Sequence, residues 1–314
     1  MVSLLKRVML LNLFLPLVNH HSFCLVDSIQ RHPTSLTNLS FLRTTLNSHI
    51  LHFAFSAPKM VVRWIVIFNK PSPMADNMVH VLETGLEVLS TENPHGKPMI
   101  KGYNIINGQL TSSSDGATFT STNPAILADT LGEFPLSTKS DVNDALDAAH
   151  AAFPGWAATP APTRGQIIGN MGRLLMEHKD AIVALETREI GKTLKESAGS
   201  VQEAIDTCLF FQSEGRRLYG QTVNSELPDK ELFTYRRPLG VCGIINACNF
   251  PAAVPFWKMI PAIMCGNTCV WKSPQDAPLL SFALARIMHE SGLPDGVINL
   301  IHGKGSGAGQ HLVD

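Results

Sequence analysis

Between residues 235 and 273 the chain alternates apolar runs with short polar turns. The run Leu239–Ile245 is followed by the polar turn Asn246–Asn249, and then by a segment with helical spacing and a proline near its start. A second apolar run, Thr268–Trp271, ends abruptly at Lys272. Unbroken apolar runs are typical of parallel strands, which are buried on both faces of a sheet. The order strand, turn, helix, strand therefore predicts a βαβ unit.

Polar residues stand where each of these two predicted strands ends. Asn246 and Asn249 follow the first strand, and Lys272 and Ser273 follow the second. Ligands of parallel sheets bind beyond the carboxyl ends of the strands. We therefore expect Asn249 and Lys272 to converge on one ligand crevice.

Four amphipathic helices are predicted upstream of this unit, because apolar residues recur there at helical spacing. Thr138 is expected to cap the first helix, and Pro154 with Gly155 to end it. Glu186 and Lys192 are expected to be surface or helix-end charges. The expected helices are Asp141–Trp156, Thr163–His178, one that starts at Asp180, and Ser197–Tyr219.

The last of these helices carries a stripe that we expect to face inward, formed by Val201, Ile205, Leu209 and Phe210. Other short elements are predicted on either side of the helices. They are two strands with a loop between residues 106 and 126, a polar hairpin at Thr222–Tyr235, a helix at Leu279–Ser291 and a third apolar strand at Val297–His302.

Composition narrows the class of protein. The chain has 314 residues, of which 45% are apolar, and a net charge of −1. This length is enough for one or two domains, and this charge gives no case for a nucleic-acid or membrane partner. The six cysteines form no C-x-x-C pair, so we expect buried thiols in a reducing compartment, no disulfides and no metal site.

Residues 1–98 differ from the rest, and three interpretations of them stay open. The apolar run Val8–Val18 is too short to span a bilayer but suits a secretory signal. Asp27 is the only acidic residue up to Ala75, which suits an organelle transit peptide. The segment could also be non-native or disordered sequence. We expect a cytoplasmic protein, with a mitochondrial location as the alternative, and two regions, 1–98 and 99–314.

The segment GIINACNFPAAVPFWKMIPAIMCGNTCVWKSP, residues 243–274, resembles the cofactor-binding core of the aldehyde dehydrogenase superfamily. It has the family's Asn-Phe-Pro turn, Trp-Lys pair, Gly-Asn helix end and Lys-Ser strand end, in that order. The resemblance runs from about Ile105 to Asp314 and includes Leu-Glu-Thr-x-x-x-Gly-Lys at residues 185–192. Met99 looks like a usual start for this family.

The resemblance implies an α/β fold with a helical amino-terminal part and an incomplete Rossmann-like parallel sheet. The cofactor-binding core would be residues 235–314. In the family, the hairpin that corresponds to Thr222–Tyr235 bridges subunits, so a full-length protein is expected to be a homo-oligomer.

The implied activity is NAD(P)-dependent oxidation of a small-molecule aldehyde to a carboxylic acid. The amide of Asn249 can donate to an oxyanion without titrating, or it can cap the following helix, and both roles can hold together. The resemblance gives Lys258 a part in proton relay or site electrostatics; otherwise it is a surface lysine. The implied cofactor-binding residues are Ile245, Asn246, Ala247, Cys248, Asn249, Lys272, Ser273, Pro274, Gln275, Gly305 and Gly309.

The choice between NAD and NADP depends on the residues that follow the second predicted strand, Thr268–Trp271. Lys272 can donate to ribose hydroxyls. Gln275 stands where many family members have a glutamate that repels a 2′-phosphate, so we expect NAD or NADP with a small preference for NAD. Gly303, Gly305 and Ala308 also fit a G-x-G-x-x-A pattern, or else form a flexible turn.

In full-length family members the nucleophilic cysteine and the general-base glutamate come after the point where this chain stops. Cys248 does not lie where the family's nucleophile lies. We therefore expect an amino-terminal fragment that is inactive as written. The alternatives are a non-catalytic nucleotide-binding or oligomer-modulating module, and an unrelated Rossmann-like protein in which Asn249 and Lys272 are structural.

Overall fold

The computed structural model describes residues 23–30, 50–57, 60–68, 87–90 and 99–314, in two compact units, residues 1–80 and 81–314. In the first unit, two strands pair antiparallel with a third: β1 (Phe23–Gln30) and β2 (Ile50–Ala57) with β3 (Met60–Phe68). The apolar run predicted at residues 8–18 lies outside the described residues.

The second unit begins before the expected boundary at residue 99. Strand β4 (Glu87–Ser90) pairs antiparallel with β5 (Met99–Lys101), and β5 pairs with β9 (Thr130–Pro135), which pairs with β8 (Thr118–Thr122). These four strands form one sheet of the unit, in the order β4-β5-β9-β8. Part of the predicted leader thus belongs to this sheet, and the leader's origin stays a prediction.

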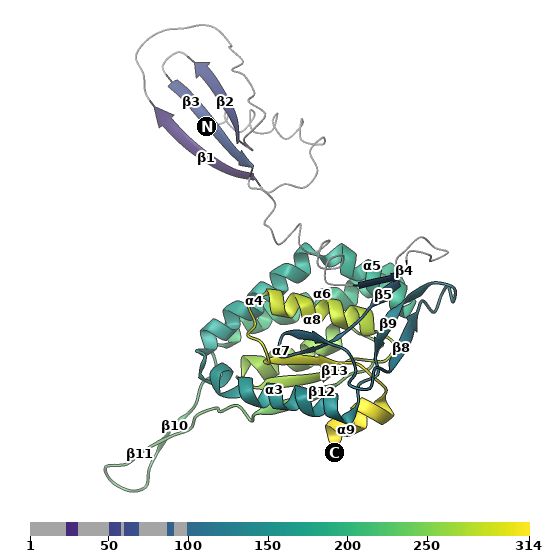
Figure 1. Cartoon of the computed structure of the whole chain (residues 1–314). Helices are drawn as coiled ribbons and strands as arrows, with labels where there is room; N and C mark the ends of the chain where they lie inside the picture. Colours follow the sequence, from purple (N-terminus) through teal and green to yellow (C-terminus); the bar gives the residue numbers. More distant parts are fainter. Residues whose placement is uncertain (1–22, 31–49, 58–59, 69–86, 91–98) are drawn as a thin grey trace. The chain divides into compact units, whose positions relative to one another are not determined.

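A five-stranded sheet carries the predicted βαβ unit. Its strand order is β12-β13-β14-β6-β7. Three strands are parallel, β12 (Val241–Ile245), β13 (Thr268–Lys272) and β14 (Ile298–Ile301), with helices α7 (Ala253–Met264) and α8 (Pro278–Glu290) between them (Figure 1). The strand, helix, strand order expected from the apolar runs is confirmed.

The sheet is mixed, because a hairpin completes it. Strands β6 (Asn104–Ile106) and β7 (Gln109–Thr111) pair antiparallel, and β6 also pairs antiparallel with β14. The turn residues Asn107 and Gly108 have φ angles of 50° and 73°. An Asn-Gly pair with both φ angles positive is a favoured two-residue hairpin turn. The sequence analysis treated residues 106–110 as one strand, which is wrong.

Helices cover both faces of this sheet. Helix α3 (Lys139–Ala158) packs Val142, Ala145 and Ala149 against Val270 and Ile301. Successive strand residues face opposite sides, so the neighbours of Val270 point to the other face, where α7 and α8 pack. A further layer of helices packs on α7 and α8 (Figure 1): α4 (Ala161–Glu177), α5 (Lys179–Ile190) and α6 (Leu194–Glu214). Among the described helices, none has both the length and the hydropathy of a membrane-spanning segment.

Helix α3 begins as predicted and ends later than predicted. Thr138 and Asp141 form a capping box at its start, in which each side chain bonds to the other's backbone N–H. Pro154 does not end the helix, which continues to Ala158. Trp156, which follows Pro154 in the helix, is buried, and its Nε1 donates to the Ile263 carbonyl oxygen at 3.0 Å. Tertiary packing of this kind outweighs the hydrogen bond that an internal proline removes.

The inward stripe predicted for α6 is only partly right. Val201 and Ile205 are buried, but Leu209 and Phe210 are 42% and 59% exposed. The buried face continues instead to Cys208, which lies three residues after Ile205. Leu209 keeps a contact with α4, since a Cβ at Gly172 would lie 3.5 Å from its Cδ2, but most of its side chain and that of Phe210 lie outside the buried stripe.

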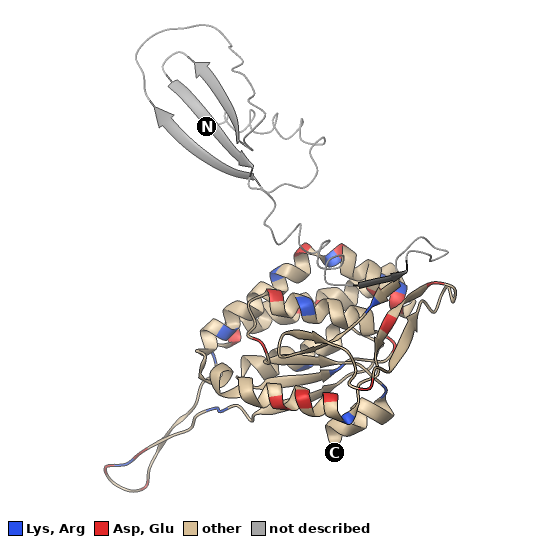
Figure 2. Cartoon of the chain, in the orientation of Figure 1, with Lys and Arg blue, Asp and Glu red and all other residues tan. Residues whose placement is uncertain are grey.

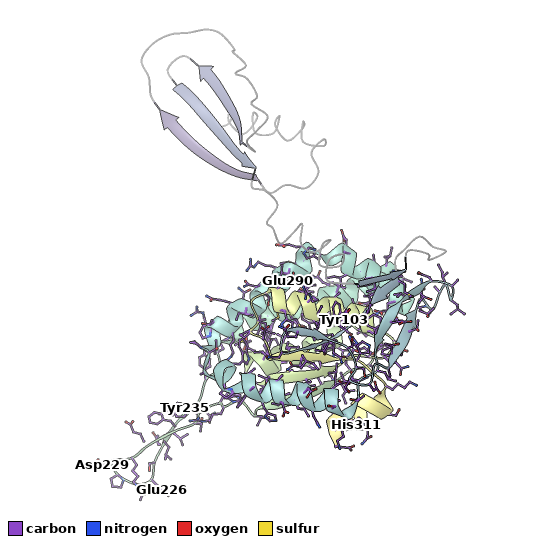
Figure 3. The ribbon with its side chains drawn as sticks, in the orientation of Figure 1. Tyr103, Glu226, Asp229, Tyr235, Glu290 and His311 are labelled. Atoms are coloured by element: carbon purple, nitrogen blue, oxygen red, sulfur yellow. The ribbon has the colours of Figure 1, made fainter. Side chains whose placement is uncertain are left out.

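The predicted hairpin between α6 and β12 is confirmed. Strands β10 (Thr222–Asn224) and β11 (Glu231–Phe233) pair antiparallel, and the hairpin extends away from the body of the unit (Figure 1). All of their residues are exposed, and Figure 3 marks Glu226, Asp229 and Tyr235 along this arm. Acidic and basic residues are interspersed over the helices of the body (Figure 2).

Candidate functional site

The three parallel strands end at the same level. Ile245 lies opposite Lys272, and Lys272 lies opposite Ile301. The turn after β12, the segment Lys272–Ser273 and the segment that starts at His302 therefore meet at one edge of the sheet. This edge is the place where parallel sheets bind ligands.

Asn246 fastens the first turn to the neighbouring strand. Its Oδ1 accepts a hydrogen bond from Trp271 Nε1 at 2.7 Å, and its Nδ2 donates to the Ala247 carbonyl oxygen at 3.1 Å. The residue is buried. Its side chain is therefore engaged within the fold, and only its main chain is left for the cofactor contact expected at this position.

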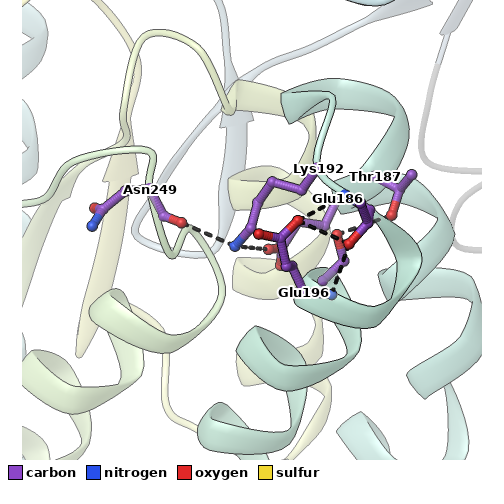
Figure 4. Close-up of polar contacts among 7 residues, drawn as sticks. Glu186, Thr187, Lys192, Glu196 and Asn249 are labelled. Atoms are coloured by element: carbon purple, nitrogen blue, oxygen red, sulfur yellow. Dashed lines mark hydrogen bonds and ion pairs between the residues drawn. The ribbon is translucent and has the colours of Figure 1, made fainter.

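Asn249 is exposed on the same turn. Its main-chain carbonyl oxygen accepts a hydrogen bond from Lys192 Nζ at 2.9 Å, and its side chain points away from this contact (Figure 4). Helix α7 begins after Ala252 and has no side-chain cap, so the helix-capping alternative for Asn249 is wrong. The side-chain amide of Asn249 does not cap the helix, and its role as a hydrogen-bond donor to an oxyanion stays a prediction.

Lys258 also reaches this edge. It is exposed on α7, and its Nζ donates to the carbonyl oxygen of Ile245, the last residue of β12, at 3.4 Å. The ammonium therefore lies at the start of the Asn246–Asn249 turn. The structure brings together Ile245, Asn249 and Lys258, three of the residues that the sequence singled out.

Lys272 is buried, at 4% exposure, under the glycine-rich segment. Its Nζ donates a long hydrogen bond of 3.5 Å to the Gly303 carbonyl oxygen. Burial lowers the pKa of Lys272, and the nearby Asp276 partly opposes that shift. A Cβ at Gly309 would stand 3.9 Å from Lys272 Cε, so the glycine lies directly against the lysine stem.

The expected turn at Gly305–Gly309 is a single π-helical turn that leads into α9 (Gln310–Val313). Gly305 is exposed and Gly309 is buried. Gly303 has a φ of 141°, in the region that favours glycine. The segment therefore closes over the end of β13 at Gly309 and stays open at Gly305.

A buried polar network that the sequence analysis missed joins the strand ends. His302 Nε2 lies 3.1 Å from the Tyr103 carbonyl oxygen and Nδ1 lies 2.8 Å from Ser273 Oγ. The carbonyl only accepts, so Nε2 carries the proton and Ser273 donates to Nδ1. Burial lowers the pKa of His302 to about 3. The hydroxyl of Ser273, expected at the cofactor, is thus used inside the protein.

A cleft of about 280 Å³ lies beside this edge, between β8, the end of α5 and the loop after β13. Cys248, Gln275 and Asp276 line it, and Pro274 is buried next to them. Burial raises the pKa of the Cys248 thiol, and Asp276 raises it further. A nucleophilic cysteine needs a lowered pKa, which supports the expectation that Cys248 is not the nucleophile.

Glu189 lines the same cleft and is fully buried. Its carboxylate accepts hydrogen bonds from the backbone N–H groups of Leu279 and Leu280 at 2.8 and 2.7 Å, at the start of α8. Burial raises the pKa of Glu189 to about 7, although these hydrogen bonds favour the ionised form. Glu189 therefore joins α5 to α8, a role that the sequence analysis did not assign.

The expectation of surface or helix-end charges is wrong for Glu186, while Lys192 does lie at a helix end, directly after the C-cap Gly191 of α5. Glu186 is fully buried and lies 3.2 Å from Lys192 Nζ, whose side chain is 15% exposed. Burial raises the pKa of Glu186, and the charge of Lys192 opposes this shift. The buried stripe of α5 is Ile182, Val183, Glu186 and Glu189. Its helical spacing was a signal that could have placed both glutamates inward.

Of the cysteines with described side chains, Cys208 and Cys269 are buried, Cys242 and Cys248 are half-buried, Cys265 is exposed, and all five are free. Within the described residues, no group of three His, Cys, Asp or Glu side chains could hold a metal ion.

Comparisons with known proteins agree with this arrangement. The α-ketoglutarate semialdehyde dehydrogenase of Haloferax volcanii is 39% identical over 210 residues, which cover 67% of this chain and 44% of that protein. The succinate-semialdehyde dehydrogenase [NADP(+)] of Escherichia coli is 36% identical, over 66% of this chain and 43% of that protein. The chain thus spans less than half the length of these curated relatives.

A solved structure and a family model point the same way. A point mutant of betaine aldehyde dehydrogenase from Staphylococcus aureus, in complex with NAD⁺, superposes with a TM-score of 0.65 at 31% identity, covering 67% of this chain and 43% of that chain. The model of the aldehyde dehydrogenase family matches residues 110–314. Since this match covers more than half of the chain, the protein belongs to the aldehyde dehydrogenase family.

Proposed function

We propose that residues 235–314 bind the dinucleotide for NAD(P)-dependent oxidation of an aldehyde to a carboxylic acid. The observation that carries this proposal is the level ending of β12, β13 and β14, which puts the Asn249 turn, Lys272 and the Gly305–Gly309 turn at one edge. A dinucleotide bound there supplies the hydride acceptor.

The residues at this edge fit such a group. The Lys272 ammonium is nearly buried, yet its bond to Gly303 is long, at 3.5 Å, so it retains donors that suit the ribose hydroxyls. Gly309 has no Cβ, which lets the backbone approach closely. Ala247 and Cys248 contribute the main chain of the turn, and Gln275 stands exposed beside the cleft.

Asn249 supplies the oxyanion donor in this proposal. A preorganised neutral donor stabilises a transition state by roughly 3 kcal/mol. Its side chain is exposed and has no capping duty, so it is available to substrate. Lys258, which lies at the start of the same turn, contributes positive potential and a proton path.

Gln275 accepts only weakly from a ribose 2′-hydroxyl and does not repel a 2′-phosphate, so it leaves room for both NAD and NADP. The relatives' names include an NADP(+) enzyme, and a solved structure holds NAD⁺. We propose that both dinucleotides bind and that NAD binds more tightly. A full-length protein is proposed to be a cytoplasmic homo-oligomer, with a mitochondrial location as the alternative.

We further propose that the polypeptide of residues 1–314 binds the dinucleotide without oxidising aldehyde. Burial raises the thiol pKa of Cys208, Cys242, Cys248 and Cys269, whereas a nucleophilic cysteine needs a lowered pKa. The second candidate function, a nucleotide-binding or oligomer-modulating module, shares this binding step. The two candidate functions differ in one prediction, because the second candidate expects no aldehyde oxidation by the full-length protein.

Titration calorimetry with NAD and with NADP on the purified chain tests these proposals. Lys272→Met should weaken NAD binding by about tenfold or more, because a charge-assisted hydrogen bond contributes roughly 1.5–3 kcal/mol. Lys195→Met, which changes an exposed lysine on α6, should leave binding unchanged. Equal affinity in the Lys272 variant and the wild type would show that Lys272 is structural and does not bind the dinucleotide. Aldehyde-dependent NADH formation by the purified chain would refute its inactivity.

A further inference from the structure

The turn between β12 and α7 needs support from outside the βαβ unit. Asn246 fixes the start of this turn through Trp271, but α7 has no side-chain cap to fix its end. Asn249 lies between these two points and is exposed. A donor amide acts on a transition state only when its position is fixed beforehand.

Lys192 reaches this turn from the helical layer. Its Nζ donates to the Asn249 carbonyl oxygen at 2.9 Å and lies 4.3 Å from the centre of the Phe250 ring (Figure 4). The ammonium thus contacts two successive residues of the turn, one by a charged hydrogen bond and one by a cation–π contact. The Asn249 side chain points away from Lys192, so these contacts leave the amide free.

The backbone on both sides of Lys192 is itself fixed. Gly191 ends α5 in the left-handed region, with a φ of 76°. Thr193 and Glu196 form a capping box at the start of α6. Lys192 therefore extends from a rigid connection between two helices.

Glu186 holds the ammonium at this place. Its carboxylate is fully buried and lies 3.2 Å from Lys192 Nζ. The pair joins a buried anion to a cation that is nearly buried, and the cation then bonds to the turn. Breaking such a pair leaves a buried charge without compensation, so the ammonium is not free to swing to solvent.

We propose that Lys192, held by Glu186, is a positioning residue that fixes the main chain of Asn249 and so keeps its amide in one orientation at the carboxyl edge of the sheet. This inference deepens the proposed function and depends on the oxyanion role of Asn249. Lys192 acts through the carbonyl group of Asn249 and does not contact substrate or cofactor.

Hydrogen exchange measured by mass spectrometry on the full chain tests the positioning directly. Lys192→Met keeps the apolar stem and removes the charge, so the amides of residues 246–254 should exchange about tenfold faster, as expected from the loss of one charged hydrogen bond. Lys192→Arg should restore most of the protection. Lys195→Met is the matched control, because it changes an exposed lysine in the first turn of α6. It should leave the exchange rates of these amides unchanged.

Binding and rate measurements separate this proposal from a general loss of stability. Lys192→Met should weaken NAD binding less than Lys272→Met does, because it loosens the turn but removes no direct contact to the dinucleotide. In a full-length protein that oxidises aldehyde, Lys192→Met should lower kcat about tenfold with a smaller change in KM for the cofactor, and Lys192→Arg should recover part of kcat.

The possible results separate the positioning role of Lys192 from its link to the Asn249 amide and from the proposed function. Unchanged exchange of residues 246–254 in Lys192→Met would overturn the positioning role, whatever the activity. Faster exchange with an unchanged kcat would overturn the link to the amide of Asn249. A wild type that neither binds NAD nor oxidises aldehyde would remove the proposed function, while the exchange experiment would still decide whether Lys192 holds the turn.

Discussion

At the scale of single residues, His302 shows how the strand ends are held together. The ring bonds to Ser273 on one side and to the backbone of Tyr103 on the other, and it packs edge-on against Phe134 at a centroid distance of 5.3 Å. The Asn104 side-chain oxygen accepts from the His302 backbone N–H and from Ser137 Oγ. This network joins β6, β13 and β14, and it requires a neutral imidazole.

The buried imidazole should make the stability of the second unit depend on pH. The pKa of His302 is about 3 in the folded state, against an ordinary value of 6.5, so the unfolded state binds the proton more tightly. This stabilisation is fully present above pH 6.5 and is lost as the pH falls toward 3. By linkage the loss is about 2 kcal/mol at pH 5.

Urea unfolding at a series of pH values measures this effect. His302→Gln is neutral throughout, so the slope of its unfolding free energy between pH 6.5 and 4 should be smaller than that of the wild type. His150→Gln, which changes an exposed histidine on α3, serves as the control. Parallel slopes for the wild type and His302→Gln would show that residue 302 does not cause the acid sensitivity.

Sequence reasoning placed Asn249 in the turn after one strand and Lys272 at the end of the next, because polar residues that follow apolar runs mark strand ends. The sequence did not reveal the hydrogen-bond partners of these side chains, because partners depend on how deeply each residue is buried and on which residues lie close to it in the fold. Asn246 was taken as a ligand residue, yet its side chain bonds to Trp271. Glu186 was taken as a surface charge, because polar residues usually are, although its spacing from Ile182 places it on the buried stripe.

At the scale of elements, local sequence signals predicted helix starts and turns correctly where tertiary packing did not oppose them. The capping box at Thr138 began α3 as expected. Pro154 and Gly155 signalled an end that packing of Trp156 overrode. The Asn107-Gly108 turn was visible in the sequence, but the strands that it joins are only three residues long, too short for an alternating pattern.

Two helical glycines should respond to alanine in opposite directions. Gly155 lies within α3, and a Cβ there would meet no atom within 4 Å. Gly155→Ala should therefore raise the unfolding free energy by about 0.5–1 kcal/mol, through the lower entropy of the unfolded chain. Gly165 lies within α4, where a Cβ would stand 2.3 Å from the Gln212 carbonyl oxygen.

Gly165→Ala should for this reason lower the unfolding free energy by about 1–3 kcal/mol, the usual cost of overpacking. Each variant is the control for the other, because the chemical change is the same and only the surroundings differ. Urea midpoints at constant m-value measure both. Loss of stability in Gly155→Ala would mean that the last turn of α3, next to Pro154, does not accept an alanine at this position.

At the scale of the whole molecule, the βαβ order could be predicted because each apolar run is local in sequence. The pairing of β6 with β14 could not, since about two hundred residues separate Ile105 from Leu300 and no local signal specifies which edge a hairpin joins. Strand β12 pairs with β13 and, within the described residues, has no second neighbour. Such an edge is open to pairing with another strand.

The arm formed by β10 and β11 also carries exposed apolar side chains. Its strands have three residues each, and an isolated two-stranded hairpin is at best marginally stable in water. Val223, Leu232 and Phe233 are nevertheless apolar and exposed on it. Contact with a second copy of the chain would remove this apolar surface from water, in line with the proposed homo-oligomer.

We therefore expect the arm to drive association without contributing to the fold of the body. Replacing Leu232 and Phe233 by lysine should shift the chain toward monomer in sedimentation velocity, and leave its melting temperature at low concentration unchanged. Leu127→Lys, at a residue that is 80% exposed outside the arm, is the matched control and should associate as the wild type does. If the arm variant sediments like the wild type at every concentration, the contact between copies lies elsewhere, and the open edge of β12 becomes the next surface to test.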